Sequence, residues 1–213
     1  MFAATPGELG DSVLNIGQMR VPAVRMSCLP KGDLTLNRLV YERFGSRNGF
    51  VRYFAYWLLA QVGTYRRFTL QRPERHRRVV FICNGNICRS PLAEVYARSL
   101  GWEAASCGFG CGDNFPADPR ARAFAKSQGL SLEAHKTVNI RDFTFRDSDF
   151  IVVMEPSHLP LFRQKVGKGY PVVLAGNYCK NPNPYIHDPF NCNEEFFERC
   201  EQRVMEAVRG ICA

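Results

Sequence analysis

The sequence predicts an α/β fold in three layers, with a central parallel sheet of about four strands, helices on both of its faces, and an N-terminal helical extension. From Arg78 onward, short apolar runs alternate with helical segments, as they do where crossover helices join parallel strands. The charge is also uneven: residues 1–78 carry 13 Lys and Arg against 5 Asp and Glu, whereas residues 79–213 carry 15 of each. We therefore expect a basic, partly helical extension over residues 1–78 and a neutral folded domain over residues 79–213.

The elements of the neutral domain follow from apolar periodicity and from the residues that begin and end helices. Four short apolar segments are expected to be strands: Val79–Cys83, Glu103–Cys107, Phe150–Met154 and Pro171–Leu174. Four segments between and after them are expected to be helices: Ser90–Leu100, Asp118 to Gly129, Ser157–Lys165 and Glu194–Val208. Pro91 is tolerated in a first helical turn, and the last helix is amphipathic.

The basic extension has a different pattern. Asp33 can cap a helix that runs to Phe44, where Gly45 stands in the stop position, and Ser46 to Gly49 is typical of a turn. The next segment, Phe50 to Val62, is rich in aromatic residues. Residues 1–30 have little periodicity, and we expect disorder at this start of the chain.

The nine cysteines do not indicate a disulfide framework. Their number is odd, and no convincing secretory signal precedes them. We therefore expect reduced thiols and a cytoplasmic location. Cys107 and Cys111 lack partners at zinc-finger spacing, so neither a metal nor a cofactor is expected.

The segment from Cys83 to Ser90 joins the first strand directly to the first helix of the neutral domain. Backbone N–H groups of such a loop can turn inward and, with the helix N-terminus, form a binding site for an anion. Gly85 is expected to adopt the left-handed turn, and the Arg89 fork suits two phosphate oxygens. Because these N–H groups and Arg89 make the site positive, Cys83 is expected to be a thiolate and a nucleophile. The residues expected to bind phosphate are Asn84, Gly85, Asn86, Ile87, Cys88, Arg89 and Ser90.

The segment VVFICNGNICRSPLAE, residues 79–94, resembles the signature of the low-molecular-weight protein tyrosine phosphatases. Shorter matches extend the resemblance to about residue 208: Ser106-Cys107-Gly108, Asp118-Pro119-Arg120, Ala134-His135-Lys136, Met154-Glu155 and Asp188-Pro189-Phe190. The resemblance implies hydrolysis through a phosphocysteine at Cys83, with Asp188 as the general acid that protonates the leaving oxygen. It also implies a hydrogen-bond network of Asn86, Ser90, Ser106 and His135. In the family a cysteine at the position of Cys88 can form a reversible disulfide with the nucleophile, and a packed loop residue is the alternative.

The residues expected beside the phosphate-binding loop indicate the class of substrate. Ile87 and Phe190 offer apolar edges for an aromatic ring, which favours a phosphotyrosine-containing protein. Members of the family often place a large apolar residue where this chain has Gly112, so Phe109 or Phe115 is expected to supply that wall. A phosphoarginine phosphatase or one for a small phosphoester stays open.

Two other classes of function are alternatives. An arsenate reductase of the same fold needs two relay cysteines, but no cysteine occurs between Cys111 and Cys179. A non-catalytic module that binds phosphotyrosine would not need the complete set of Cys83, Arg89 and Asp188.

The extension suggests a surface partner. The apolar run from Phe50 to Val62 is too short to span a bilayer and contains Arg52. Its aromatic residues and the arginines that follow suit a helix lying on an anionic membrane surface, which would make the protein peripheral to a membrane, or a helix that docks on a partner. Packing on the neutral domain is the alternative. No motif for recognising nucleic acid accompanies the charge.

Overall fold

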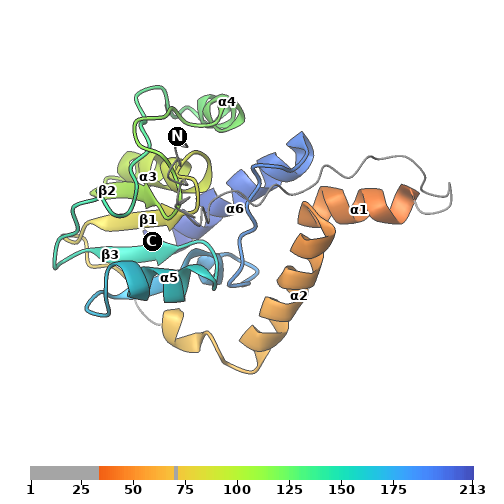
Figure 1. Cartoon of the computed structure of the whole chain (residues 1–213), viewed down its shortest axis with the longest axis horizontal. Helices are drawn as coiled ribbons and strands as arrows, with labels where there is room; N and C mark the ends of the chain where they lie inside the picture. The colour runs from red at the N-terminus through yellow and green to blue at the C-terminus, as the bar shows by residue number, and fades with distance from the viewer. Residues whose placement is uncertain (1–33, 70–71) are drawn as a thin grey trace, which may run out of the picture.

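In the computed structural model, which describes residues 34–69 and 72–213, a four-stranded parallel sheet forms the centre of the molecule (Figure 1). The strands are β1 (Val79–Cys83), β2 (Ala104–Gly108), β3 (Phe150–Val153) and β4 (Val172–Leu174), arranged in the order β2-β1-β3-β4. This arrangement confirms the predicted α/β fold. Asp33 and residues 1–30, for which a helix cap and disorder were predicted, lie outside the described residues.

β1 lies inside the sheet and pairs with β2 on one side and β3 on the other. All five of its residues are buried, which explains why VVFIC is a continuous apolar run rather than an alternating one. The strand order changes direction at β1, and in open α/β sheets ligands bind beyond the carboxyl ends of the strands at such a point. Cys83 is the last residue of β1 and therefore stands at this position.

The two faces of the sheet carry separate apolar layers. Val79, Phe81 and Cys83 face the layer formed by α3 (Arg89–Ser99), α4 (Pro119–Ser127) and α6 (Glu194–Ile211). Val80 and Ile82 face the opposite layer, which includes α5 (His158–Lys165) and the 3-10 helix η1 (Arg66–Phe68). Alternate strand residues thus bury both faces, as three layers require.

The predicted elements of the domain are present with ends shifted by a few residues. α6 continues past the predicted Val208 to Ile211, which is buried against the sheet, and β4 is followed by an unpredicted 3-10 helix, η2 (Ala175–Tyr178). The predicted turn from Ser46 to Gly49 is wrong, because only Ser46 lies outside a helix. Its hydroxyl accepts a hydrogen bond from the Gly49 amide at 2.8 Å and so caps α2 (Arg47–Gln61).

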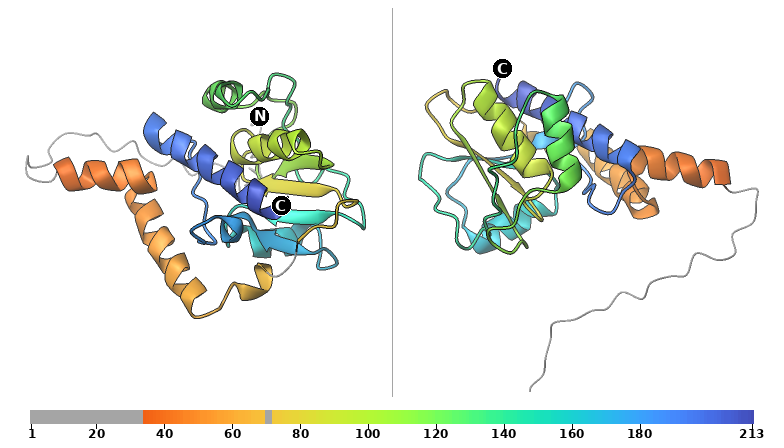
Figure 2. Two further views of the ribbon diagram at one scale, coloured as in Figure 1. Left: turned by 180° about the vertical axis from the view of Figure 1, so that it is seen from behind. Right: turned by 90° about the horizontal axis from the view of Figure 1, so that it is seen from above.

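The two helices of the extension, α1 (Leu34–Phe44) and α2, lie to one side of the α/β body (Figures 1 and 2). Gly45, at φ +74°, ends α1 as predicted and forms the corner between the two helices. The chain then returns to the body through η1, whose Phe68 is buried under the sheet beside β4. The extension therefore contacts the domain at this corner, along α2 through Tyr53 and Tyr56, and at η1.

Candidate active site

The loop from Cys83 to Ser90 connects β1 to the N-terminus of α3, as the sequence predicted. The left-handed residue in this loop is Asn86, at φ +51°, and not Gly85 as expected from the sequence. Asparagine tolerates this conformation better than most residues, and here its side chain is fixed by hydrogen bonds that glycine could not make. Gly85 is only partly buried, and a Cβ there would meet nothing closer than Ile87, at 3.4 Å.

The Asn86 side chain is the centre of a buried hydrogen-bond network. Its Nδ2 donates to the hydroxyls of Ser90 and Ser106, each at 2.9 Å, and its Oδ1 accepts from the Val138 amide at 2.9 Å. His135 donates from Nε2 to the Asn86 carbonyl at 2.8 Å. The structure thus brings together Asn86, Ser90, Ser106 and His135, the four residues that the family resemblance implied. Fully paired buried groups of this kind hold a loop in one conformation.

The Cys83 sulfur lies at the bottom of the loop and is only 2% exposed. The Asn86 amide donates to it at 3.2 Å, and the Ser90 hydroxyl lies 3.0 Å away. Burial raises the pKa of the Cys83 thiol, while the charge of Arg89 and the contact with Ser90 lower it. Because burial is the largest influence, the pKa lies above its ordinary value, in contrast to the thiolate expected from the sequence.

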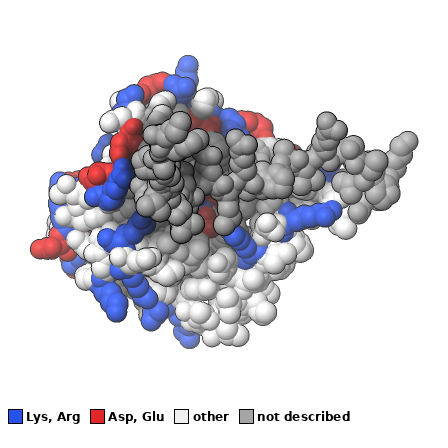
Figure 3. Space-filling model, in the orientation of Figure 1, with Lys and Arg blue, Asp and Glu red and all other residues white. Residues whose placement is uncertain are grey.

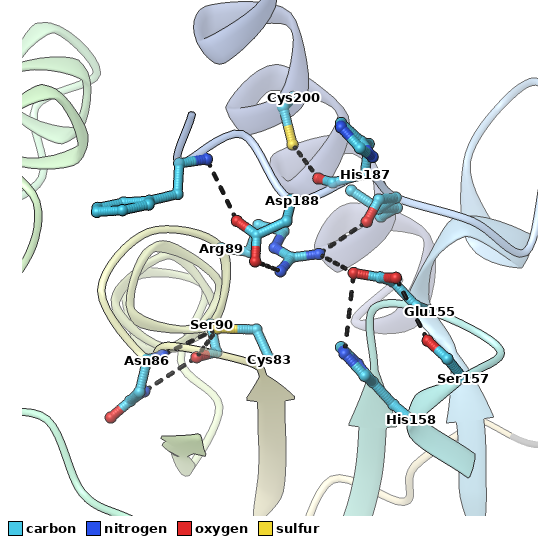
Figure 4. A network of polar contacts seen from close by, with 12 residues as sticks. Cys83, Asn86, Arg89, Ser90, Glu155, Ser157, His158, His187, Asp188 and Cys200 are labelled. Atoms are coloured by element: carbon cyan, nitrogen blue, oxygen red, sulfur yellow. Dashed lines mark hydrogen bonds and ion pairs between the residues drawn. The ribbon is translucent and has the colours of Figure 1, made fainter. Parts of the chain in front are cut away.

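Arg89 holds two carboxylates and a carbonyl at once. Its Nη2 lies 2.7 Å from Asp188 Oδ2, and its Nη1 lies 2.8 Å from Glu155 Oε1 and 2.9 Å from the Ile186 carbonyl. Figure 4 shows the guanidinium between the carboxylates of Asp188 and Glu155. The negative charge of Asp188 raises the pKa of the Cys83 thiol and so offsets part of the effect of Arg89.

A cavity of about 190 Å³ opens above the sulfur. The described residues that line it are Cys83, Asn84, Gly85, Ile87, Cys88, Arg89, Asp188 and Phe190. Of the predicted wall residues, Ile87 and Phe190 therefore lie at the cavity. Phe109 does not, because its ring is buried against His158 on the other face of the sheet, and Phe115 is exposed away from the lining.

Cys88 lies at the start of α3 and is buried, and both Cys83 and Cys88 are free thiols. Burial raises the pKa of Cys88, which disfavours its thiolate. A reversible disulfide between these two cysteines therefore stays a prediction.

Sequence reasoning matched Glu155 to a family motif but assigned it no role. Glu155 follows β3 by two residues, at the same edge of the sheet as Cys83. Its carboxylate accepts a hydrogen bond from Arg89, the side chain that also binds Asp188. Its position after a buried strand, next to the strand that ends in Cys83, is the signal that could have identified it.

A thiol at the start of an anion-binding loop, with an arginine that closes the loop and a carboxylate above it, defines the class of cysteine-dependent phosphatases. Comparison with known families gives the same class. The sequence profile described as "Low molecular weight phosphotyrosine protein phosphatase" matches residues 78–213. The chain belongs to this family, and it is a cysteine-dependent protein-tyrosine phosphatase.

Individual relatives agree. The chain is 30% identical over 148 residues to the human low molecular weight phosphotyrosine protein phosphatase, a match that covers 62% of this chain and 92% of that protein. The low molecular weight protein-tyrosine-phosphatase of Streptomyces coelicolor is 31% identical over 156 residues, which cover 64% of this chain and 92% of that protein. The crystal structure of the tyrosine phosphatase AmsI of Erwinia amylovora superposes with a TM-score of 0.58 at 26% identity, covering 66% of this chain and 95% of that chain.

Proposed function

We propose that this phosphatase hydrolyses phosphotyrosine in proteins and that Cys83 forms the phosphocysteine intermediate. The observation that carries the proposal is the position of Arg89. Its Nε is buried and makes no hydrogen bond within the described part of the chain, which leaves a donor beside Cys83 for a phosphoryl oxygen. The ring of the substrate would then lie between Ile87 and Phe190 in the cavity.

The proposed reaction has two steps. The Cys83 thiolate attacks phosphorus in line with the leaving oxygen, and the loop amides and Arg89 bind the phosphoryl oxygens. Asp188 donates a proton to that oxygen, so that the tyrosine leaves as a neutral phenol. Asp188 then takes a proton from a water molecule, which attacks the phosphocysteine and releases phosphate and the Cys83 thiolate. Ser90 and the Asn86 amide stabilise the thiolate against the effect of burial.

Two features favour tyrosine over other phosphorylated residues. The sulfur is buried at the bottom of the cavity, so a long, flat side chain reaches it more easily than phosphoserine does. Phosphoarginine would add a cationic group above the loop, yet Asp188 is the only carboxylate among the described lining residues and already pairs with Arg89.

One peptide sequence carrying phosphotyrosine, phosphoserine or phosphoarginine tests the substrate. We expect the highest kcat/KM for phosphotyrosine. Phe190→Ala should raise KM for that peptide by about tenfold with a smaller change in kcat, since the ring loses contact area of the kind worth about 1–2 kcal/mol. Phe115→Ala, outside the cavity, is the matched control. A preference for phosphoarginine, or arsenate reduction coupled to thioredoxin without phosphatase activity, would overturn the proposal.

We further propose that the extension attaches the protein to an anionic membrane surface. Ten of the thirteen most exposed large apolar side chains in the described residues lie between Leu36 and Val62, so the apolar surface is concentrated on α1 and α2. Residues 34–69 contain six arginines and one acidic residue, Glu42. Figure 3 shows a mainly uncharged surface at the lower right, where α2 lies. No helix among residues 34–69 and 72–213 is long and apolar enough to cross a bilayer.

Sedimentation of the full chain with vesicles tests this attachment. We expect binding to vesicles that contain anionic lipid, and release by salt, because each arginine near such a surface contributes about 1 kcal/mol. Leu58→Glu, at a site 60% exposed on α2, should weaken binding by about tenfold or more. Phe115→Glu, at a site 61% exposed on the domain, should not. Equal binding of the two variants, or no binding at low salt, would contradict the proposal.

A further inference from the structure

We propose that the corner between α1 and α2 positions the general acid by holding the loop that carries Asp188. This inference rests on the proposed function, because it concerns the step in which Asp188 donates a proton. The acid loop, residues 185–192, runs from the sheet toward the start of α6, which the corner also approaches (Figure 2). The corner residues involved lie in the extension, before the segment that matches the family.

Gly45 forms the closest part of this contact. A Cβ built on Gly45 would stand 2.6 Å from Cys192 Sγ and 2.8 Å from His187 Cδ2, so the backbone of the corner lies directly against side chains on both sides of Asp188. Gly49, one turn into α2, lies against the same ring, since its Cβ would stand 3.2 Å from His187 Cε1. His187 immediately precedes Asp188. The corner therefore packs on the side chain of the residue next to the general acid, while the His187 carbonyl accepts a hydrogen bond from Cys200 of α6 at 3.2 Å.

The segment before Asp188 makes further contacts with α2. Asn183 donates to the Tyr53 carbonyl at 3.3 Å, and the ring of Tyr185 packs on Tyr56 with 5.4 Å between the ring centroids. The Tyr185 hydroxyl is also hydrogen-bonded to His187 Nδ1. Side chains at alternate positions of this segment thus face the extension, as an extended chain allows.

The other positions of the same segment face the active site. The Ile186 carbonyl accepts from Arg89 Nη1, and the Asp188 carboxylate pairs with Arg89 Nη2. The chain on this side of Asp188 is therefore held between the extension and Arg89. After Asp188 the domain adds to the contact between Gly45 and Cys192, because Arg120 donates to the carbonyls of Phe190 and Cys192 at 2.6 and 3.0 Å.

A general acid needs this kind of support because proton transfer requires a heavy-atom separation of about 2.6–3.2 Å. The Asp188 side chain is 36% exposed, so packing around the carboxylate itself cannot hold it. Its position depends on the backbone at His187 and on Arg89. If the contacts at the corner are lost, the acid loop can shift while the phosphate loop, residues 83–90, keeps its own hydrogen bonds.

Two glycine substitutions in the full chain distinguish an effect on the position of Asp188 from a general loss of structure. Gly45→Ala places a methyl group against the acid loop and 2.7 Å from Cε1 of Phe196 on α6. Gly63→Ala, at φ +82°, meets only the flexible Arg66 side chain. Both variants introduce the same backbone strain within the extension. The measurement is the ratio of kcat/KM for phenyl phosphate to that for 4-nitrophenyl phosphate, because the poorer leaving group depends more on the acid. We expect Gly45→Ala to lower this ratio by about tenfold and Gly63→Ala to leave it unchanged.

Asp188→Ala provides the reference. It should lower the ratio more than Gly45→Ala does, and adding Gly45→Ala to it should lower the ratio no further, since no acid is left to position. If Asp188→Ala leaves the ratio unchanged, the proposed function has the wrong acid. If Asp188→Ala lowers the ratio but Gly45→Ala reduces activity on both substrates equally, only the positioning proposal is overturned.

A second pair of variants applies if Gly45→Ala does not fold. Tyr56→Ala removes the ring that packs on Tyr185 without changing the acid loop, and Tyr56→Phe keeps that ring. We expect the leaving-group ratio to fall in Tyr56→Ala and to return to the wild-type value in Tyr56→Phe. Equal ratios in both variants and in the wild type would overturn the proposal.

Discussion

The two loops of the active site are supported in different ways. The phosphate loop, residues 83–90, is held by side chains of the family domain, with Asn86 at their centre. The acid loop is held by the domain and by the extension together, because Arg120 binds the carbonyls after Asp188 and Gly45 packs on side chains on both sides of it. The hydrogen bonds of the loop that binds phosphate thus come from residues within the family match, whereas the part that donates a proton also contacts a segment that lies outside this match.

The largest expected effect concerns the phosphate loop alone. Cys83→Ser should reduce turnover by at least about 10⁴-fold, because a serine hydroxyl keeps its proton where a thiol can lose it. Binding of inorganic phosphate, measured by thermal stabilisation, should persist, since the loop amides and Arg89 are unchanged. Cys111→Ser, at a partly buried site outside the loop, is the control. More than a trace of turnover in Cys83→Ser would exclude Cys83 as the nucleophile.

The next effect concerns the residue that joins the two loops. Arg89→Lys should lower kcat/KM by about 10²- to 10³-fold, because one ammonium group cannot replace a fork that holds Asp188, Glu155 and phosphate together. Steady-state kinetics on 4-nitrophenyl phosphate measure the loss. Arg98→Lys, at an exposed site on the same helix, should change kcat/KM less than twofold. A similar small change in Arg89→Lys would show that the loops act without this link.

The same difference between the loops explains what the sequence could predict. The phosphate loop was predictable because its residues are close in the sequence and lie between a recognisable strand and helix. The error in its backbone geometry, Gly85 in place of Asn86, arose because both residue types tolerate a positive φ, and distant partners such as Ser106 and Val138 decide between them.

The supports of the acid loop were not predictable in this way. Asp188 was identified by a dipeptide motif, but the contact between Gly45 and His187 joins residues far apart in the sequence and has no local pattern. The position of Phe109 was likewise decided by tertiary packing, because the chain after β2 directs that ring toward His158. The boundary near Arg78 stays a prediction, although the corner at Gly45 packs against the domain.

A smaller effect concerns the stability of the protein. It comes from a buried carboxylate that, unlike the side chains of the phosphate loop, has no hydrogen-bond partner among the described residues. Glu201, on α6, is 0% exposed, and neither of its carboxylate oxygens makes a hydrogen bond within the described residues. Burial raises the pKa of Glu201 to about 8, so the folded protein holds a proton that the unfolded chain releases above its ordinary pKa of 4.5. The stability contribution is therefore fully present below about pH 4.5 and is lost as the pH rises toward about 8.

Glu201→Gln removes this titration. At pH 7 the variant should be more stable than the wild type by about 3 kcal/mol, and the difference should disappear below about pH 4.5. Urea unfolding at several pH values measures it. Glu198→Gln, at an exposed site on the same helix, is the control. A difference that does not change with pH would show that Glu201 is ionised or paired in the folded protein.

The smallest effect concerns the proton of the nucleophile. The Ser90 hydroxyl lies 3.0 Å from the Cys83 sulfur and lowers the pKa of the thiol, whereas burial raises it. Removing the hydroxyl in Ser90→Ala should therefore raise the pKa further and leave a smaller fraction of thiolate at neutral pH. Alkylation of Cys83 by iodoacetamide, followed by mass spectrometry of its peptide, should be slower by up to about tenfold at pH 7, with its midpoint at higher pH. Ser99→Ala, on the exposed end of the same helix, should match the wild type. An unchanged or lower midpoint in Ser90→Ala would mean that the hydroxyl accepts a hydrogen bond from the thiol, and the Asn86 amide would then be left as the donor that stabilises the thiolate.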